Sequence, residues 1–115
     1  MDTRKYSNAQ EKNIAKQLGG KKQPNSGATP FLKGDVKTSD FLIEAKTQIE
    51  NKKSFTVKKE WLDKNKEEAF SIGKEFSALA FNFGGLNNKD NYYIIDEFTM
   101  KVFMGLVERL NEQCN

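Results

Sequence analysis

Histidine is absent from this 115-residue sequence, and its single cysteine, Cys114, stands next to the last residue. Without histidine there can be no Ser-His-Asp or Cys-His catalytic site and no imidazole-ligated metal. One cysteine excludes a disulfide framework and a cysteine-based zinc site, and it is typical of a reducing compartment. The sequence has no run of 18 apolar residues and no signal-peptide core at its polar start. We therefore expect a cytoplasmic protein with no membrane partner.

The length and composition predict a single domain spanning residues 1–115. Hydrophobic residues make up 37% of the chain and include nine phenylalanines, enough for a modest core although 30% of the residues are charged. Residues 1–60 carry 13 basic and 7 acidic side chains, whereas residues 61–115 carry 6 and 9. A polyanion would be drawn to the first half, although lysine-rich segments are often only solvated surface.

Residues 34–46 carry the most informative pattern, two short strands joined by a tight turn. If the loop consists of Ser39 and Asp40 alone, Asp35 lies directly opposite Glu44, with Cβ atoms roughly 5 Å apart. Lys46 projects from the same face as Glu44, because side chains two residues apart share a face of a strand. The other face is apolar and suited to a core, with Val36, Phe41, Ile43 and Ala45. A loop one residue longer or shorter would separate the two acids.

Two opposed carboxylates repel each other, so this register calls for a compensating charge. A hard divalent cation with oxygen ligands is the natural candidate. A cation held by two acids beside an ammonium group is suited to phosphodiester cleavage, because the cation polarises the phosphate and lowers the pKa of a bound water. Lys46 would then orient that water or steady the developing charge. The alternative is a surface hairpin whose Asp, Glu and Lys side chains are merely solvated.

Upstream of the hairpin, the spacing Ser7-x-x-Gln10 predicts a capping box and a helix from Ser7 to about Leu18, ending at Gly19-Gly20. Glu11 falls on the buried side of this helix, together with Ile14, Ala15 and Leu18. It is either a third carboxylate aimed at the metal or an acid that favours the helix N-terminus through the dipole. Residues 19–30 are a loop by composition, and their Ser26-Gly27 pair either lets the backbone approach phosphate or forms an ordinary turn.

The remainder of the chain predicts a short extended piece at 54–57, a helix over 58–72, strands over 76–83 and 92–96, and a helix over 98–110. The helix over 58–72 has Trp61, Leu62, Asn65, Ala69 and Ile72 along one side. The aromatic residues of 76–83 favour a core over a base-stacking platform. The last helix carries more apolar surface than one core-facing stripe needs, because Met100 and Met104 extend the stripe of Phe98, Val102, Phe103, Leu106 and Val107. This surface predicts a dimer contact, the alternative being a helix wrapped by its own sheet.

The motif Gly34-Asp35 … Glu44-Ala45-Lys46, after a helix that bears Glu11, resembles that of the PD-(D/E)xK nuclease superfamily. Gly34 stands where the signature proline would be. Within the superfamily the chain is most similar to archaeal-type Holliday junction resolvases and their phage-encoded relatives. The likeness rests on residues 11–20, on Ser26-Gly27-Ala28 and on the motif itself. It implies an α/β (α+β), restriction-endonuclease-like fold with a central mixed β-sheet flanked by helices, in the order α-β-β-β-α-β-β-α.

The resemblance implies that Asp35, Glu44 and the Ala45 carbonyl bind Mg²⁺, with Mn²⁺ as a substitute, and that Glu11 completes the acidic site. It implies that Lys46 positions the water and that Ser26 acts from a mobile loop over residues 19–30. The implied activity is a magnesium-dependent endonuclease that resolves four-way DNA junctions as a homodimer, in the host cytoplasm if phage-encoded. The residues expected to bind DNA are Lys21, Lys22, Lys33, Lys37, Lys58 and Lys59. The alternatives are a nicking or restriction-like nuclease and a non-catalytic DNA-binding protein of the same fold.

Overall fold

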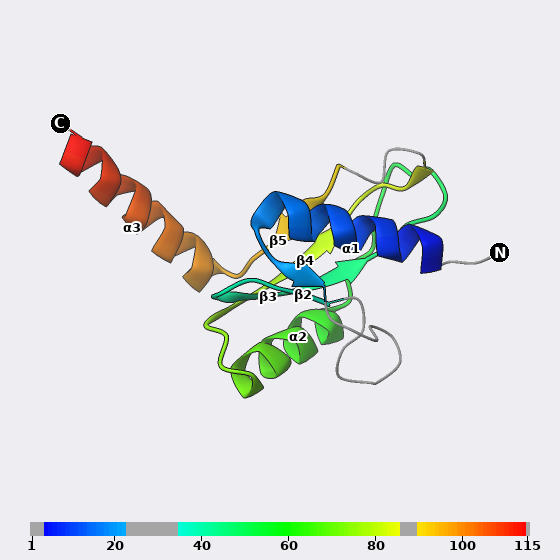
Figure 1. Cartoon of the computed structure of the whole chain (residues 1–115), viewed down its shortest axis with the longest axis horizontal. Helices are drawn as coiled ribbons and strands as arrows, with labels where there is room; N and C mark the ends of the chain where they lie inside the picture. The colour runs from blue at the N-terminus through cyan, green and yellow to red at the C-terminus, as the bar shows by residue number, and fades with distance from the viewer. Residues whose placement is uncertain (1–3, 23–34, 86–89, 115) are drawn as a thin grey trace.

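The computed structural model describes residues 4–22, 35–85 and 90–114, which form one mixed sheet with helices around it (Figure 1). Three helices and five strands are defined in this part of the chain. In chain order they are α1 (Arg4–Leu18), β1 (Lys21–Lys22), β2 (Asp35–Lys37), β3 (Phe41–Lys46), α2 (Lys59–Ser71), β4 (Phe76–Phe81), β5 (Tyr92–Ile94) and α3 (Glu97–Cys114). The predicted mixed α/β class, with a mixed sheet flanked by helices, is confirmed.

The strands lie side by side in their sequence order, β1-β2-β3-β4-β5. Neighbouring strands are antiparallel except β3 and β4, which are parallel and are connected through α2. A parallel pair needs such a crossover, since a tight turn can join only antiparallel strands. The strand that carries Glu44 and Lys46 is therefore the central strand of the sheet, with two strands on either side.

The predicted hairpin register is confirmed. Asp35 pairs with Glu44, and Val36 pairs with Ile43. The turn is closed by two bonds, because the Thr38 amide donates to the Phe41 carbonyl at 3.0 Å and the Phe41 amide donates to Thr38 Oγ1 at 3.0 Å. A turn that is bonded at both ends allows no slip of one residue, and such a slip would move every side chain to the other face.

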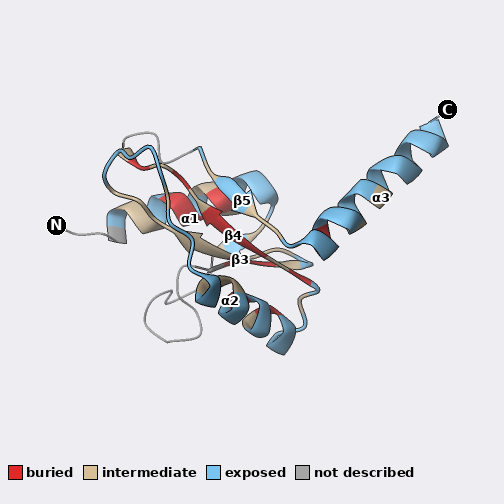
Figure 2. Ribbon diagram, turned by 180° about the vertical axis from the view of Figure 1, so that it is seen from behind, coloured by how far each residue is buried: buried red, intermediate tan, exposed pale blue. Residues whose placement is uncertain are grey.

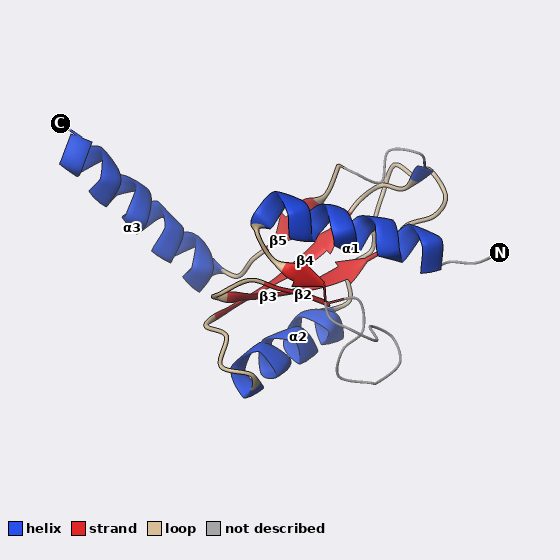
Figure 3. Ribbon diagram, viewed as in Figure 1, coloured by secondary structure: helices blue, strands red, loops and turns tan. Residues whose placement is uncertain are grey.

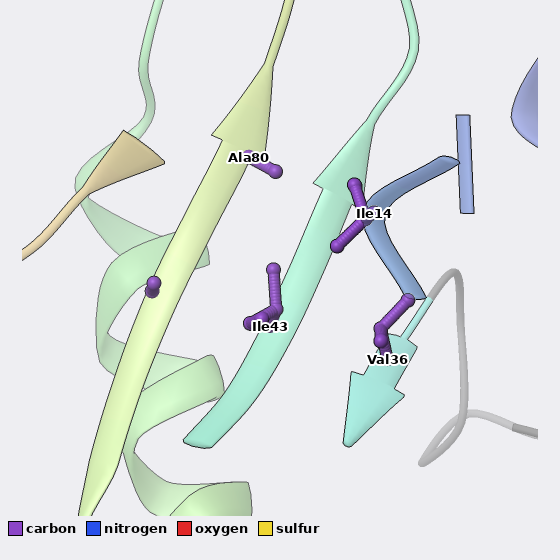
Figure 4. Packing of buried hydrophobic residues seen from close by; sticks show 5 residues of the cluster. Ile14, Val36, Ile43 and Ala80 are labelled. Atoms are coloured by element: carbon purple, nitrogen blue, oxygen red, sulfur yellow. The ribbon is translucent and has the colours of Figure 1, made fainter. Parts of the chain in front are cut away.

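Helices α1 and α2 cover opposite faces of the sheet (Figures 1 and 3). The main core cluster lies between α1 and the sheet (Figure 4). It consists of Ile14 from α1 and of Val36, Ile43, Ala78 and Ala80 from the strands. Under α2 lie Leu42 and Leu79, both almost fully buried. Each buried Val, Leu or Ile side chain contributes roughly 1.5–3 kcal/mol relative to an exposed one. The apolar face predicted for the hairpin is the face that packs against α1.

Helix α1 begins earlier than predicted, at Arg4, so that Ser7 lies inside it and the predicted capping box is wrong. The predicted C-terminus is confirmed, because the helix ends at Leu18. Gly19 adopts φ 70°, and the Gly20 amide donates to the Ala15 carbonyl at 2.9 Å, as in a Schellman cap.

The loop predicted over residues 19–30 is interrupted at once by β1, in which Lys21 pairs with Lys37 and Lys22 with Val36. Gly20 permits this approach, because a Cβ there would lie 2.8 Å from the Lys37 carbonyl oxygen. The rest of the predicted loop, residues 23–30, lies outside the described residues.

In the second half of the chain most observed helix and strand boundaries differ from the predicted ones by one to four residues. Strand β4 ends at Phe81, and the Asn82 side chain that follows accepts a hydrogen bond from the Gly84 amide at 2.9 Å. Ile72, predicted to face inward, follows α2 and is 45% exposed. Residues 54–57 are described as a loop and form no strand.

Helix α3 projects from the end of the sheet into solvent (Figure 2), which gives the molecule dimensions of 53 × 31 × 26 Å. Among the described residues its first turns contact the body, where the ring of Phe103 lies 5.7 Å from that of Phe41 and 6.0 Å from that of Phe76. The alternative of a helix wrapped by its own sheet is therefore wrong. None of the helices in the described ranges is both long and apolar enough to cross a membrane.

Candidate active site

The last residues of β3 present Glu44 and Lys46 on the face covered by α2. Their partners in the parallel pairing with β4 are Leu79 and Phe81, which lie on the same face. Asp35 is the antiparallel partner of Glu44 on the other side. The sheet thus brings the three residues of the predicted motif into register at one end of its central strand, although the side chain of Asp35 lies outside the described part.

Glu44 and Lys46 form a half-buried ion pair. Lys46 Nζ lies 3.4 Å from Glu44 Oε1, and the two side chains are 28% and 17% exposed, respectively. Burial raises the pKa of the Glu44 carboxyl above its ordinary value, although the ammonium groups of Lys46 and Lys64 oppose this shift. The carboxylate therefore gains from any further positive charge brought to it.

The second carboxylate oxygen of Glu44, Oε2, is buried and accepts no hydrogen bond from the described residues. An unsatisfied buried carboxylate oxygen is costly, and such atoms in folded proteins call for an explanation such as an ion. A hard cation that prefers carboxylate ligands would remove this cost. One buried carboxylate oxygen of the described residues is therefore available to a hard divalent cation of the kind that the hairpin pattern predicts.

Glu11 is buried in α1, with 2% of its surface exposed. The predicted burial of this acid is confirmed, but α1 covers the face of the sheet opposite to that of Glu44 and Lys46 (Figure 3). Among the described side chains, which do not include that of Asp35, no group of three or more acids, cysteines or histidines is close enough to hold a metal ion. The roles of Glu11 and of the Ala45 carbonyl as ligands remain predictions.

Gln10 is a site residue that the sequence reasoning missed. Its side chain is fully buried, and Nε2 donates to the Lys46 carbonyl at 3.0 Å and to Asn91 Oδ1 at 3.0 Å. Its Oε1 accepts from Thr47 Oγ1 at 2.7 Å. These bonds tie α1 to the end of β3, directly after the residues of the motif. The available signal was position, because residue 10 lies one turn before Ile14 on the buried side of the helix.

A second residue that was missed in this role is Trp61, which was predicted only to face inward from its helix. Lys46 Nζ lies 4.2 Å from the centroid of its ring, and Lys58 Nζ lies 5.6 Å from it. The ring comes from the first turn of α2, which the crossover from β3 to β4 brings back over the sheet. No local sequence pattern indicates this contact, since it depends on how the crossover packs.

The lysines predicted to bind DNA fall into two groups. Lys21, Lys22 and Lys37 line an open pocket of about 490 Å³ together with Lys74, which was not predicted. The strand register places Lys21 and Lys37 on the same face as Glu44. Lys22 is turned the other way, and its Nζ donates to Asn8 Oδ1 at 2.6 Å.

The second group stands at the start of α2. Lys58 lies beside Trp61, whereas Lys59 is held by Asp63 at 2.7 Å, a hydrogen bond that raises the pKa of this exposed lysine. Lys33 and Ser26 lie outside the described residues, so their roles remain predictions. The described lysines of the predicted DNA-binding set thus belong to strands β1 and β2 and to the start of α2.

Comparisons of the chain with protein-family models, with curated proteins and with solved structures gave no match.

Proposed function

We propose that the protein is a magnesium-dependent, structure-selective endonuclease with a restriction-endonuclease-like fold, which resolves four-way DNA junctions. The observation that carries this proposal is the strand register. It sets Asp35 opposite Glu44 and leaves Lys46 two residues further along the same strand. The buried, unsatisfied oxygen of Glu44 supports a metal at this position, and the lysines on the same face support a polyanionic substrate.

The chemistry assigned to each residue follows from its charge and position. Asp35, Glu44 and the Ala45 carbonyl would hold the ion, and Glu11 is the further acid that the sequence offers. When bound, magnesium supplies a Lewis acid for the phosphate and lowers the pKa of a bound water. The Lys46 ammonium, 3.4 Å from Glu44, stands where it can donate to an attacking water or to a phosphate oxygen.

Cleavage of a synthetic four-way junction, compared with a linear duplex of the same sequence, tests this proposal. We expect magnesium-dependent cleavage of the junction, and loss of cleavage with retained DNA binding in Asp35→Asn, Glu44→Gln and Lys46→Ala. Asp40→Asn and Glu67→Gln are matched controls, because both acids are exposed and neither is one of the motif residues. Retention of more than about a tenth of the wild-type rate, roughly 1.4 kcal/mol of barrier, would remove a residue from the mechanism.

The same experiment separates the other functions. Equal cleavage of junction and duplex indicates a nicking or restriction-like nuclease, because the catalytic residues would be shared and only the substrate would differ. Binding of DNA without cleavage under any divalent metal indicates a non-catalytic DNA-binding protein.

We propose further that the nuclease is a homodimer, since two symmetric incisions need two sites and each chain has one. Helix α3 offers the contact surface. Seven of its apolar side chains are between 37% and 59% exposed, namely Phe98, Met100, Phe103, Met104, Leu106, Val107 and Leu110. With roughly 100 Å² exposed on each, they approach the surface of about 800 Å² per partner that a standard interface buries.

A second copy of this chain is the partner that fits this surface best. The helix carries three acids and two bases, so neither DNA nor an anionic membrane would be attracted to it. The body of the protein has an apolar groove of about 380 Å³, lined by Leu18, Phe41, Ile43, Ala78, Tyr93, Ile95 and Phe103. The outer half of α3 extends away from the body of its own chain (Figure 1), but a twofold axis would allow each helix to reach the groove of the other.

Light scattering at micromolar concentration tests the dimer and should give about twice the chain mass of 13.1 kDa. Val107→Glu should shift the protein to the monomer, because a buried unpaired charge opposes association. Lys101→Glu is the matched control, since it adds the same side chain on the charged side of the helix. A wild-type monomer at all concentrations would refute the dimer and leave the nuclease proposal standing.

A further inference from the structure

The ammonium group of Lys46 is held between a carboxylate and an indole ring. Its Nζ lies 3.4 Å from Glu44 Oε1 and 4.2 Å from the centroid of Trp61. A cation at this distance is attracted to the electron-rich face of the ring, and the attraction grows as water is excluded. Two contacts from two different elements, β3 and α2, thus restrict where this flexible side chain can point.

The indole ring is itself supported by an aromatic chain. The ring of Phe55 lies 6.2 Å from that of Trp61 and stacks on Phe81 at 4.7 Å with an interplanar angle of 18°. Phe81 is the β4 partner of Lys46 in the parallel register. The three rings therefore run from Phe81, beside the backbone of Lys46, through Phe55 to Trp61 at the ammonium group of Lys46. These contacts restrict the position of the Trp61 ring.

An open pocket of about 490 Å³ adjoins this arrangement. Lys46 and Trp61 form part of its wall, and the loop after β3 contributes Lys52, Ser54 and Thr56. None of the described residues that line it is acidic. Lys52 is paired with Glu50 at 3.5 Å, but both side chains are largely exposed, so that this pairing is weak and easily exchanged.

We propose that this pocket is a phosphate subsite, which binds a backbone phosphodiester next to the one that is cleaved, and that Trp61 is the positioning residue for Lys46. This inference rests on the proposed nuclease function. Two ammonium groups and two hydroxyl groups are donors suited to phosphate oxygens. A stacked base is the less suitable occupant, because the ammonium groups of Lys46 and Lys58 both lie over the indole ring.

Binding without turnover tests the subsite. The chain has one tryptophan, so its intrinsic fluorescence reports on the pocket directly when an unlabelled four-way junction is titrated in calcium or in chelator. We expect a saturable fluorescence change. We also expect Lys52→Gln to lower the slope of log affinity against log salt by about 1, as the loss of one phosphate contact should.

Lys53→Gln is the matched control for this measurement, because Lys53 is the adjacent exposed lysine and does not line the pocket. An equal effect of the two substitutions would mean general attraction to DNA and would overturn the subsite, as would DNA binding without any change in fluorescence. Strong quenching with no effect of Lys52→Gln would indicate a stacked base instead and would also overturn the phosphate assignment.

The positioning role is tested by cleavage kinetics. Trp61→Leu should lower kcat on the order of tenfold with little change in KM, and Trp61→Phe should restore most of the rate, because phenylalanine keeps an aromatic face. Phe83→Leu is the control, since Phe83 contacts Phe81 and Tyr92 in the same aromatic cluster. An equal loss in Trp61→Phe and Trp61→Leu, or the same loss in Phe83→Leu, would overturn the role.

The two proposals fail in different ways. If the protein binds the junction but cleaves nothing, the nuclease proposal fails, while the fluorescence change and the salt slopes still decide whether the pocket binds a backbone phosphate. If cleavage depends on Asp35, Glu44 and Lys46, but the Trp61 fluorescence does not change and Lys52→Gln has the same effect on binding as Lys53→Gln, the subsite proposal fails and the nuclease proposal stands.

Discussion

Gln10 should be among the most sensitive polar residues of the protein, although it lies in a helix far from the motif in sequence. Replacing it with alanine removes three hydrogen bonds, to the Lys46 carbonyl, the Thr47 hydroxyl and Asn91. The side chain is fully buried, so water cannot take its place without opening the contact between α1 and β3. The substitution also leaves a cavity of several atoms at the end of the strand that carries Glu44.

The magnitude follows from these contacts. A typical intramolecular hydrogen bond contributes roughly 0.5–1.5 kcal/mol net, and a buried partner left unsatisfied costs about 1–3 kcal/mol. Because Asn91 and Thr47 are only partly buried, we take the lower part of these ranges. The expected loss in the free energy of unfolding is about 3 kcal/mol. For a domain of this size it corresponds to a fall in Tm of roughly 10 °C.

Urea unfolding followed by circular dichroism measures this loss, with Gln17→Ala as the control. Gln17 is in the same helix but exposed, so the same substitution should change the stability by less than about 0.5 kcal/mol. Cleavage should also fall, because the carbonyl that Gln10 holds belongs to Lys46. If Gln10→Ala cost less than about 1 kcal/mol, or no more than Gln17→Ala, the anchoring role would be wrong.

Three further predictions concern pH, metal and the start of α3. Burial raises the pKa of Glu44, so the contribution of Glu44 to the stability of the metal-free protein should fall as the pH rises from 4.5 through the raised pKa. Urea unfolding of Glu44→Gln should not show this fall, and the same pH profile in wild type and variant would contradict the prediction. Magnesium or manganese should support cleavage and calcium should support binding with little turnover, because the looser oxygen shell of calcium positions water poorly; full activity in excess chelator would exclude the metal. Hydrogen bonds from the hydroxyl and amide of Thr99, with one from Lys66, lower the pKa of Asp96 to about 2. Asp96→Ala should therefore lower the free energy of unfolding by about 1 kcal/mol at neutral pH, and by progressively less as the pH falls through 3.8 toward 2. Asp90→Ala, at an exposed position, is the control in the same unfolding assay, and an equal loss of stability in both variants would contradict the role of Asp96.

The hairpin could be predicted from sequence because two local rules agree. The turn residues fix the loop length, and the alternation of side chains between the two faces of a strand then decides which of them share a face. The same alternation places Val36 and Ile43 in the core. Burial of Glu11 could be predicted in the same way, from the helical period and the position of Ile14.

The parts that could not be predicted depend on contacts between elements distant in sequence. The spacing from Ser7 predicts that Gln10 belongs to a capping box, whereas in the structure the helix begins further upstream, at Arg4. Strand β1 has only two residues, and it exists because Gly20 lets it approach β2. The contact of Trp61 with Lys46 follows from the crossover between parallel strands, which no local pattern describes.

The outward course of α3 has a consequence for how the helix itself is stabilised. Beyond Phe103, residues 104–114 of the helix extend away from the described body of their own chain (Figure 2). Isolated helices shorter than about 12–15 residues are marginal in water. The outer half should therefore fray in a separated chain and become ordered when two chains associate. Amide protons of residues 104–114 should exchange with deuterium faster on dilution, whereas those of β3 should not. Quaternary assembly would thus complete secondary structure that the single chain only begins.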